Sequence, residues 1–424
     1  MPRISGVSPV RDSPQHASSP AQKTPIARSA PSFPRIGESS APKPIQRQPS
    51  PPRESHLSSS LPERRVARTD TEEEEQIEEP AISRTDYPDA SKANRRPPCL
   101  KTGPKEIFTK YDTRLLAVCG KYVCTTGYLT KVWDLTTGEQ VMSLSHGETV
   151  KSLSLAFKPG KGLEDEGERI WLGTSAGDLH EVDIPSQSIV ATRSYPSRRE
   201  VIQILRHGKE MWTFDDEGRL LIWLPDESGT PNLQYSYHSA QERVARGHTF
   251  SMVVEDKLWL AAGKDVYIYR PNAREDASFK VFKRPLGLQH SGDVTSGTYT
   301  TREGGRVYLG HADGKVTIYS ATDFTCLAVV NVSVYKINCL GFVGDYLWAA
   351  YKTGMIYVYD VTTNPWTVKK DWRAHDSPVS GFVLDMSSVW TMNRLQVTSL
   401  GTDNCIRLWD GMLEDDWLGK CKSV

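Results

Sequence analysis

The sequence has few cysteines and lacks the long apolar runs that membrane-spanning proteins need. It carries 7 cysteines in 424 residues, and no two of them form a C-x-x-C pair. Such sparse use fits a reducing compartment better than a disulfide framework or a zinc site. No run of about 18 apolar residues occurs, and the N-terminus has no apolar secretory segment. We therefore expect a cytoplasmic protein without a transmembrane span.

The chain also lacks an excess of charge of either sign. Lys+Arg and Asp+Glu both number 52, so the formal net charge is zero. A strongly basic surface is the usual electrostatic footprint of a protein that binds nucleic acid. The balanced composition gives no reason to expect a nucleic-acid partner.

Tryptophan is missing from the first 100 residues, which hold 17 of the 27 prolines. A segment so poor in large apolar side chains cannot offset the entropy lost on folding. Within it, the run "DTEEEEQIEE" (70–79) carries seven acids and no base. We predict that residues 1–100 form a long disordered tail rich in proline and serine, with an acidic run at 70–79.

From about residue 105 the sequence repeats itself. Each unit has two short apolar strands joined by a turn that contains Gly, Asp or Asn, and the final aromatic or apolar anchors recur every 40 to 50 residues. The anchors are Trp133, Val182, Trp223, Tyr269, Tyr319, Tyr359 and Trp409. The strands alternate with period two and are rich in Val, Ile, Tyr and Trp, which argues against a helical solenoid. Endings such as "VWD" and "LWD" at this period are typical of WD repeats.

The pattern predicts an all-β fold, a seven-bladed WD40-type β-propeller over residues 105–411 with a C-terminal tail at 412–424. The last unit has no recognisable outer strand, whereas "EIFTKYD" (106–112) is a spare strand before the first unit. Because an unpaired strand edge invites aggregation, we expect 106–112 to close the last blade.

The seventh unit departs from the common spacing. Its second strand is expected near Val389 and Trp390, yet Trp390 stands 19 residues before Trp409. Removing "MNRLQVTSL" (392–400) would restore the spacing of the other units. We interpret 392–400 as surplus, either a surface loop or the mark of an alternative or mispredicted transcript.

No catalytic, cofactor-binding or metal-binding motif is present, and we expect no cofactor. Four histidines, His146, His248, His290 and His375, recur in the loops that lead into the units. In WD-repeat proteins a histidine at this position is structural and bonds to a carboxylate in the same unit. Asp178 for His146 and Asp313 for His290 are candidate partners.

The loops at the rim remain for function, and one stretch there is basic: "SRREVIQILRHGK" (197–209). A solvated rim is the simpler interpretation, and a site for acidic peptides or phosphoinositide membranes is the sharper one. The candidate binding residues, at equivalent positions in several units, are Lys151, Arg198, Arg199, Arg246 and Lys336.

Two stretches, "KVWDLTTGE" (131–139) and "GTDNCIRLWDGMLEDDWL" (401–418), carry a resemblance to a known family. With the units between them, they resemble the WD-repeat region of fungal and plant-type inositol-polyphosphate 5-phosphatases, over about 105–418. In that family a Mg²⁺-dependent phosphatase domain follows the propeller. Its W-x-G-D-x-N and P-x-W-x-D-R motifs have no match here, so no catalytic residue is carried over.

The resemblance implies a non-catalytic module that targets or scaffolds phosphoinositide dephosphorylation, in a chain that stops where its relatives continue to their phosphatase domain. As written, the chain is expected to be no enzyme. The alternative is a generic WD40 scaffold, such as a ubiquitin-ligase adaptor or a trafficking protein. In either case we expect a monomer that binds other proteins through its rim loops.

Overall fold

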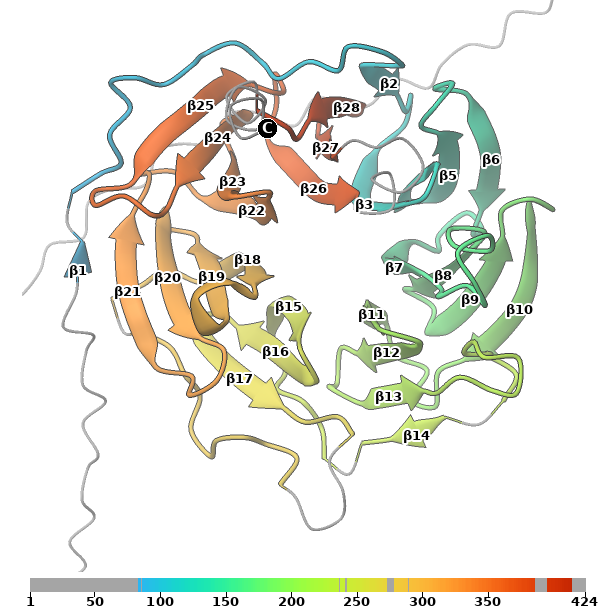
Figure 1. The fold of residues 1–424 in the computed structure, drawn as a ribbon. Helices are drawn as coiled ribbons and strands as arrows, with labels where there is room; N and C mark the ends of the chain where they lie inside the picture. Colours follow the sequence, from blue (N-terminus) through green and yellow to red (C-terminus); the bar gives the residue numbers. More distant parts are fainter. Residues whose placement is uncertain are drawn as a thin grey trace, which may run out of the picture. The chain divides into compact units, whose positions relative to one another are not determined.

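The computed structural model describes residues 83–84, 86–235, 237–240, 242–272, 278–288, 290–385 and 395–413. Over these residues the chain forms seven sheets around a central opening (Figure 1). The only helical element among them is the short 3-10 helix η1, Arg302–Gly304. The predicted all-β, seven-bladed propeller is thereby confirmed.

Each sheet is one blade, and we number the blades 1 to 7 from the sheet that begins with β3. An inner strand lines the opening, and a second and a third strand follow it outward. The inner strands are β3 (Thr113–Cys119), β7 (Ser152–Phe157), β11 (Val201–His207), β15 (His248–Val254), β18 (Val294–Thr300), β22 (Ile337–Val343) and β26 (Val379–Asp385). The second strands are β4 (Tyr122–Gly127), β8 (Arg169–Thr174), β12 (Glu210–Asp215), β16 (Lys257–Ala262), β19 (Arg306–His311), β23 (Tyr346–Tyr351) and β27 (Gln396–Gly401). The third strands are β5 (Leu129–Asp134), β9 (Asp178–Asp183), β13 (Leu220–Trp223), β17 (Asp265–Tyr269), β20 (Lys315–Ser320), β24 (Met355–Asp360) and β28 (Cys405–Asp410).

Most blades have a fourth, outer strand. These are β6 (Gln140–Ser145), β10 (Ser188–Ser194), β14 (His238–Ser239), β21 (Cys326–Asn331), β25 (Thr367–Arg373) and, in blade 7, β2 (Glu106–Phe108). Blade 5 gains a fifth strand, because β1 (Ser83–Arg84) pairs in parallel with β21. Blade 4 has no fourth strand among the described residues, which make only isolated β-bridges on the outer side of β17.

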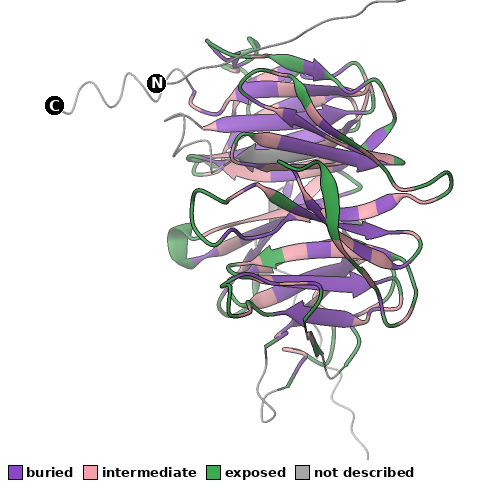
Figure 2. Ribbon diagram, turned by 90° about the vertical axis from the view of Figure 1, so that its right-hand side faces the viewer, coloured by how far each residue is buried: buried purple, intermediate pink, exposed green. Residues whose placement is uncertain are grey.

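The core lies between neighbouring blades, not inside any one sheet. Each hydrophobic cluster of the described residues combines side chains from two adjacent blades, and Trp171 of blade 2, for example, packs with Trp223 of blade 3. The repeated aromatic of the second strands, such as Trp171 or Trp348, is fully buried. Figure 2 shows the same division, with buried residues along the strands and exposed ones in the loops. The aromatic repeat is therefore core packing, because large rings fill the space between the sheets.

The strand β2 lies at the outer edge of blade 7, although it precedes blade 1 in the sequence. It pairs antiparallel with β28, and Ile107 stands opposite Ile406. Ile107 is 5% exposed and packs with residues of blades 7 and 1. The expected closing strand 106–112 thus has its paired part at Glu106–Phe108, and the ends of the propeller share one sheet.

The segment just before β2, residues 86–105, packs against the propeller, and we call it the strap. In Figure 1 it runs along the outside of blade 6, next to β25, and reaches β2. The backbone N–H of Asp89 donates to the carbonyl of Trp366 at 2.7 Å, and that of Asn94 to Lys369 at 2.9 Å. Leu100 is only 2% exposed. The boundary predicted for the tail, residue 100, is therefore too late, because 86–100 already contact the blades.

The second strand of blade 7 is not where the aromatic spacing placed it. It is β27, Gln396–Gly401, which pairs with both β26 and β28. The interpretation of 392–400 as surplus is wrong for 396–400, which are part of the sheet, while Val389 and Trp390 lie outside the described residues. At the far end, Leu413 is buried in the core between blades 6 and 7, so the packed chain extends past residue 411.

Candidate interaction surface

All five predicted rim residues lie in loops that lead from an outer strand into the next inner strand. These loops and the turns between second and third strands share one side of the ring, which we call the top face. Arg199 and Arg246 occupy equivalent places, each two residues before the inner strands β11 and β15 of blades 3 and 4. The repeat geometry therefore sets two arginines side by side on neighbouring blades.

The carboxylate of Glu217, in the turn between β12 and β13, joins this pair of blades. Nε of Arg199 lies 3.2 Å from one of its oxygens, and Nη1 of Arg243 lies 3.0 Å from the other. Although desolvation opposes the shift, the nearby guanidinium groups, that of Arg246 included, hold the pKa of the Glu217 carboxyl below its usual range. We call Arg199, Glu217, Arg243 and Arg246 the arginine cluster.

The cluster is not uniformly positive. Glu200 and Asp216 are exposed beside it, and the N–H of Asp216 donates to the carbonyl of Glu200 at 3.1 Å. The ion pairs of Arg199 and Arg243 with Glu217 are exposed to solvent, and such pairs add little to stability. Both arginines therefore remain available to a partner. Arg198 is exposed in the preceding turn, with φ +55°, and makes no ion pair with any residue in the described ranges. This surface suits a ligand with discrete carboxylates better than a continuous anionic one.

Lys151 lies one blade earlier, before β7 of blade 2. Its ammonium group sits 4.5 Å from the ring centre of Tyr128, in the turn between β4 and β5. Tyr128 is 44% exposed, so the pair presents a cation and an aromatic face to solvent. Lys151 was predicted from its charge and its place before an inner strand, whereas no sequence signal pairs it with Tyr128 of the preceding blade.

Lys336 lies on the same face but on blade 6, apart from the arginine cluster on blades 3 and 4. It is exposed and directly follows Val334 and Tyr335, which are 70% and 55% exposed. The loop before Lys336 is anchored to the turn between β19 and β20, where the carbonyl of Gly314 accepts a hydrogen bond from the N–H of Ser333 at 3.1 Å. The predicted residues therefore lie in two separate regions of the top face, one on blades 2 to 4 and the other on blade 6. They do not form a single continuous patch.

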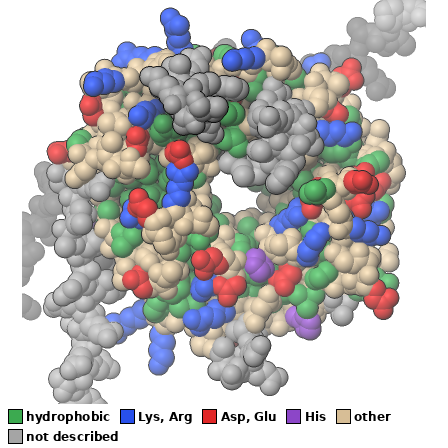
Figure 3. Space-filling model, viewed as in Figure 1, with side chains coloured by type: hydrophobic (Ala, Val, Ile, Leu, Met, Phe, Trp, Pro, Cys, Tyr) green, Lys and Arg blue, Asp and Glu red, His purple; other side chains and the backbone are tan. Residues whose placement is uncertain are grey.

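The rest of the basic stretch 197–209 points to the opposite side of the ring and is paired. Arg206 makes a bidentate contact with Glu166, with both N–O distances 2.8 Å. His207 lies 3.3 Å from Glu210, and the ammonium group of Lys209 donates to the carbonyl of Gly160. Arg206 and Lys209 thus contact the loop 159–167, and all three basic groups already have partners within the chain. Figure 3 shows acidic and basic side chains interspersed over one face around the central opening.

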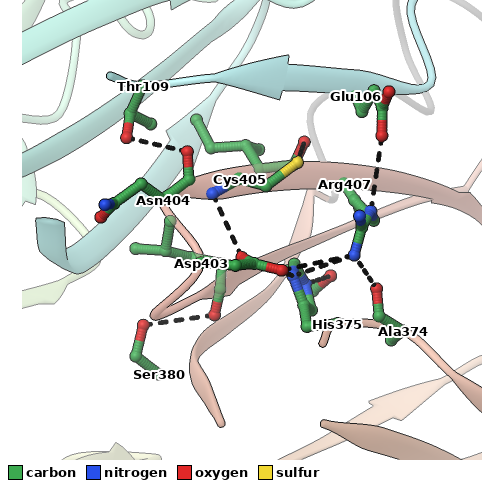
Figure 4. Close-up of polar contacts among 12 residues, drawn as sticks. Glu106, Thr109, Ala374, His375, Ser380, Asp403, Asn404, Cys405 and Arg407 are labelled. Atoms are coloured by element: carbon green, nitrogen blue, oxygen red, sulfur yellow. Dashed lines mark hydrogen bonds and ion pairs between the residues drawn. The ribbon is translucent and has the colours of Figure 1, made fainter. Parts of the chain in front are cut away.

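The histidine of blade 7 belongs to a buried polar chain. Nδ1 of His375 lies 3.1 Å from Asp403, and Nε2 lies 2.8 Å from Oγ of Ser399. The same Oγ accepts a hydrogen bond from the indole of Trp409 at 2.8 Å. Figure 4 shows how Asp403 and Arg407 converge on this histidine. Desolvation lowers the pKa of His375, so the imidazole is neutral and structural, as expected.

The candidate partner of His146 is wrong. Its Nε2 hydrogen-bonds with Oγ1 of Thr130 at 2.7 Å, and its Nδ1 has no hydrogen-bond partner among the described residues. Asp178 instead accepts a hydrogen bond from Ser194 at 2.7 Å. No group of three or more His, Cys, Asp or Glu side chains within the described ranges is arranged to hold a metal ion. No helix in that part of the chain is long and apolar enough to cross a membrane.

Comparison with known proteins supports the resemblance seen in the sequence. The chain is 36% identical over 342 residues to a probable inositol polyphosphate 5-phosphatase of Schizosaccharomyces pombe. The match covers 78% of this chain and 28% of that protein, so the chain spans little more than a quarter of its curated relative. No protein-family model matches the chain.

A chain in the crystal structure of the mitotic checkpoint complex has the same fold. Its TM-score is 0.57 at 15% sequence identity, and the match covers 77% of this chain and 96% of that one. At this identity the likeness shows the fold alone. By sequence and by fold, this chain is a seven-bladed propeller related to a segment of an inositol polyphosphate 5-phosphatase-like protein.

Proposed function

We propose that this chain is a non-catalytic protein-interaction and targeting module of an inositol polyphosphate 5-phosphatase-like protein. It acts in the cytoplasm as a monomer. One observation carries the proposal: the similarity to the fission-yeast protein takes up most of this chain and only 28% of the relative, and the described part of this chain is a propeller. A propeller without catalytic motifs contributes binding through its loops, while chemistry belongs to other domains.

The arginine cluster on the top face is the proposed contact for a partner protein. Two arginines at equivalent positions of adjacent blades present planar groups that bind carboxylates in pairs. The exposed acids Glu200 and Asp216 lie among them and would repel a continuous anionic membrane. The ligand that fits is an acidic peptide segment of a protein, whose carboxylates replace that of Glu217.

The test compares proteins that co-purify with the wild-type chain and with an Arg199→Glu/Arg246→Glu variant. Lys336→Glu, on blade 6 of the same face, is the matched control for a charge reversal outside the cluster. We expect enzymes of phosphoinositide metabolism among the proteins that co-purify, and their loss with the double variant alone. Recovery of those enzymes by all three proteins would remove the arginine cluster from the proposal. Recovery of ligase subunits in their place would favour a generic scaffold.

A second experiment separates a peptide from a membrane. The purified chain is mixed with a labelled acidic peptide of alternating Glu and Ser, and in parallel with vesicles that contain a phosphoinositide. We expect saturable peptide binding that weakens as salt rises, because the contact is electrostatic and exposed. Binding to the vesicles without binding to the peptide would overturn the assignment of a protein partner.

The absence of catalysis is tested directly. Purified chain with Mg²⁺ and an inositol polyphosphate or phosphoinositide is expected to release no more phosphate than buffer alone. A rate that exceeds the buffer and scales with the concentration of the chain would refute the non-catalytic role, whatever the partner experiments show.

A further inference from the structure

A cavity of about 480 Å³ lies between blades 2 and 3, on the side of the ring opposite the top face. Its size falls within the range of roughly 300–1,000 Å³ that holds small ligands. One wall comes from the loop that joins β7 to β8 and from the strands β9 and β10. The other wall is the segment 228–234 that follows β13. None of the rim residues considered above lines this cavity.

The blade 2 wall carries a buried ionic network. Nζ of Lys158 and Nη1 of Arg169 both lie 2.9 Å from the same oxygen of Glu181. The second oxygen of Glu181 accepts a hydrogen bond from the indole of Trp171 at 3.1 Å. The side chain of Glu181 is 3% exposed and that of Lys158 8%. Lys158 and Glu181 are therefore a buried ion pair, and a charged ligand that displaced one of them would leave the other as a buried charge without a partner. A charged ligand thus has little access to either side chain.

The wall from blade 3 is polar and uncharged. Four residues of a segment made of turns and bends line the cavity here: Ser228, Thr230, Asn232 and Gln234. Hydroxyl and amide groups each offer both donors and acceptors. The amide of Gln234 makes no side-chain hydrogen bond with any residue in the described part of the chain, so its donors and acceptor are open to a ligand.

Charge and polarity together define the ligand. The lining holds three bases, Lys158, Lys161 and Arg169, and three acids, Asp165, Glu168 and Glu181, so it favours neither sign. A neutral compound with many hydroxyl groups can donate to the carboxylates and accept from the amides without breaking the ionic network. Pro159, Val190 and Ala191 supply the apolar surface on which the C–H face of a sugar or cyclic polyol rests.

We propose that this cavity is a binding site for a neutral, polyhydroxylated small molecule of the carbohydrate or polyol class. The site is separate from the arginine cluster and does not depend on the proposed function. A bound sugar-like ligand would join blades 2 and 3 through their outer parts, where blade 3 has only the two-residue outer strand β14.

The test is saturation-transfer NMR and calorimetry on the full chain with a panel of neutral sugars and polyols at roughly 10 mM, since such ligands bind weakly. Charged analogues of the best compound, an amino sugar and a uronic acid, are measured alongside it. We expect at least one neutral compound to bind and both charged analogues to bind less tightly. If no compound in the panel binds, or if a charged analogue binds most tightly, the proposal fails.

Variants locate the site. Gln234→Leu removes an amide and should lower the association constant about tenfold, the worth of one to two hydrogen bonds. Val190→Trp fills the cavity and should abolish binding. Gln140→Leu makes the same change as Gln234→Leu on the exposed edge of blade 1 and should bind as the wild type does. Equal binding by all variants, each with a wild-type melting temperature, would place the ligand elsewhere and overturn the assignment.

Discussion

Nδ1 of His375 and the carboxylate of Asp403 lie 3.1 Å apart, and this contact ties the loop before blade 7 to a turn within it. The chain of hydrogen bonds continues through Ser399 to the indole of Trp409. Asp403 also lies 3.5 Å from Arg407, which contacts Glu106 of the closing strand at 3.6 Å. The polar chain thus extends from the interior of blade 7 to the strand that closes the ring.

Ser399→Ala should destabilise the protein by about 1–3 kcal/mol, because the buried groups of His375 and Trp409 lose a common partner. The measurement is the free energy of unfolding in urea. Ser188→Ala, on the exposed outer strand of blade 2, is the matched control and should change stability by less than about 0.5 kcal/mol. Equal effects of the two changes would show that the polar chain does not stabilise the blade.

The closing strand offers a sharper comparison, because two adjacent residues face opposite ways. Ile107 is 5% exposed and Phe108 is 58% exposed. Ile107→Asp should lower stability by about 3 kcal/mol or more, since it buries a charge between blades 7 and 1, whereas Phe108→Asp should be nearly neutral. Deletion of 101–112 should lower the melting temperature further. An unchanged melt after that deletion would mean that β2 does not hold the ring closed.

The strap predicts how truncations behave. A chain that begins at residue 101 loses Leu100 from the core and the backbone hydrogen bonds of Asp89 and Asn94 to blade 6. It should therefore melt at a lower temperature than a chain that begins at residue 86, as measured by circular dichroism. The substitution Leu100→Asp in the full chain should reproduce most of the difference. If both truncated chains melt together, the strap contributes no stability.

The architecture was predictable because the same kinds of residue recur at corresponding positions of successive units. Strand alternation, turn residues and the recurring anchors placed six of the seven units close to their strands. In blade 7 the search for an aromatic failed, since Thr398 pairs opposite Leu408 at the place that Trp171 takes opposite Glu181. The strap was missed for a similar reason: its contacts are mostly backbone hydrogen bonds, which leave no trace in composition.

The candidate surface was only partly predictable. The equivalence of Arg199 and Arg246 followed from their positions before inner strands. Their shared partner Glu217 could not be assigned, because which turn faces which loop depends on the packing of adjacent blades. The stretch 197–209 looked like a free basic surface because the partner of Arg206, Glu166, lies 40 residues away in the sequence.

Acid should destabilise the fold through histidines that are buried in the neutral form. Burial lowers the pKa of His248 from 6.5 to about 4. Between those values the unfolded chain binds a proton that the folded chain does not, so stability is complete above pH 6.5 and falls as the pH drops toward 4. The loss is at most about 3 kcal/mol for this residue.

The free energy of unfolding in urea, measured from pH 7 to pH 4, should show a shallower decline for His248→Gln than for the wild type. His238→Gln, on an exposed strand, should keep the wild-type decline, and a matching decline for His248→Gln would contradict the assignment.

Glu217 holds the arginine cluster in a partly neutralised state, and this predicts the effect of removing its charge. Glu217→Gln leaves Arg199 and Arg243 without their carboxylate partner, so an acidic ligand no longer competes with it. The variant should bind the labelled Glu/Ser peptide a few times more tightly than the wild type at low salt, and the difference should shrink as salt screens the charges. Glu139→Gln, which makes the same change at an exposed position of blade 1, should have no effect. Weaker binding by Glu217→Gln would mean that the glutamate orients the arginines for the ligand and does not compete with it.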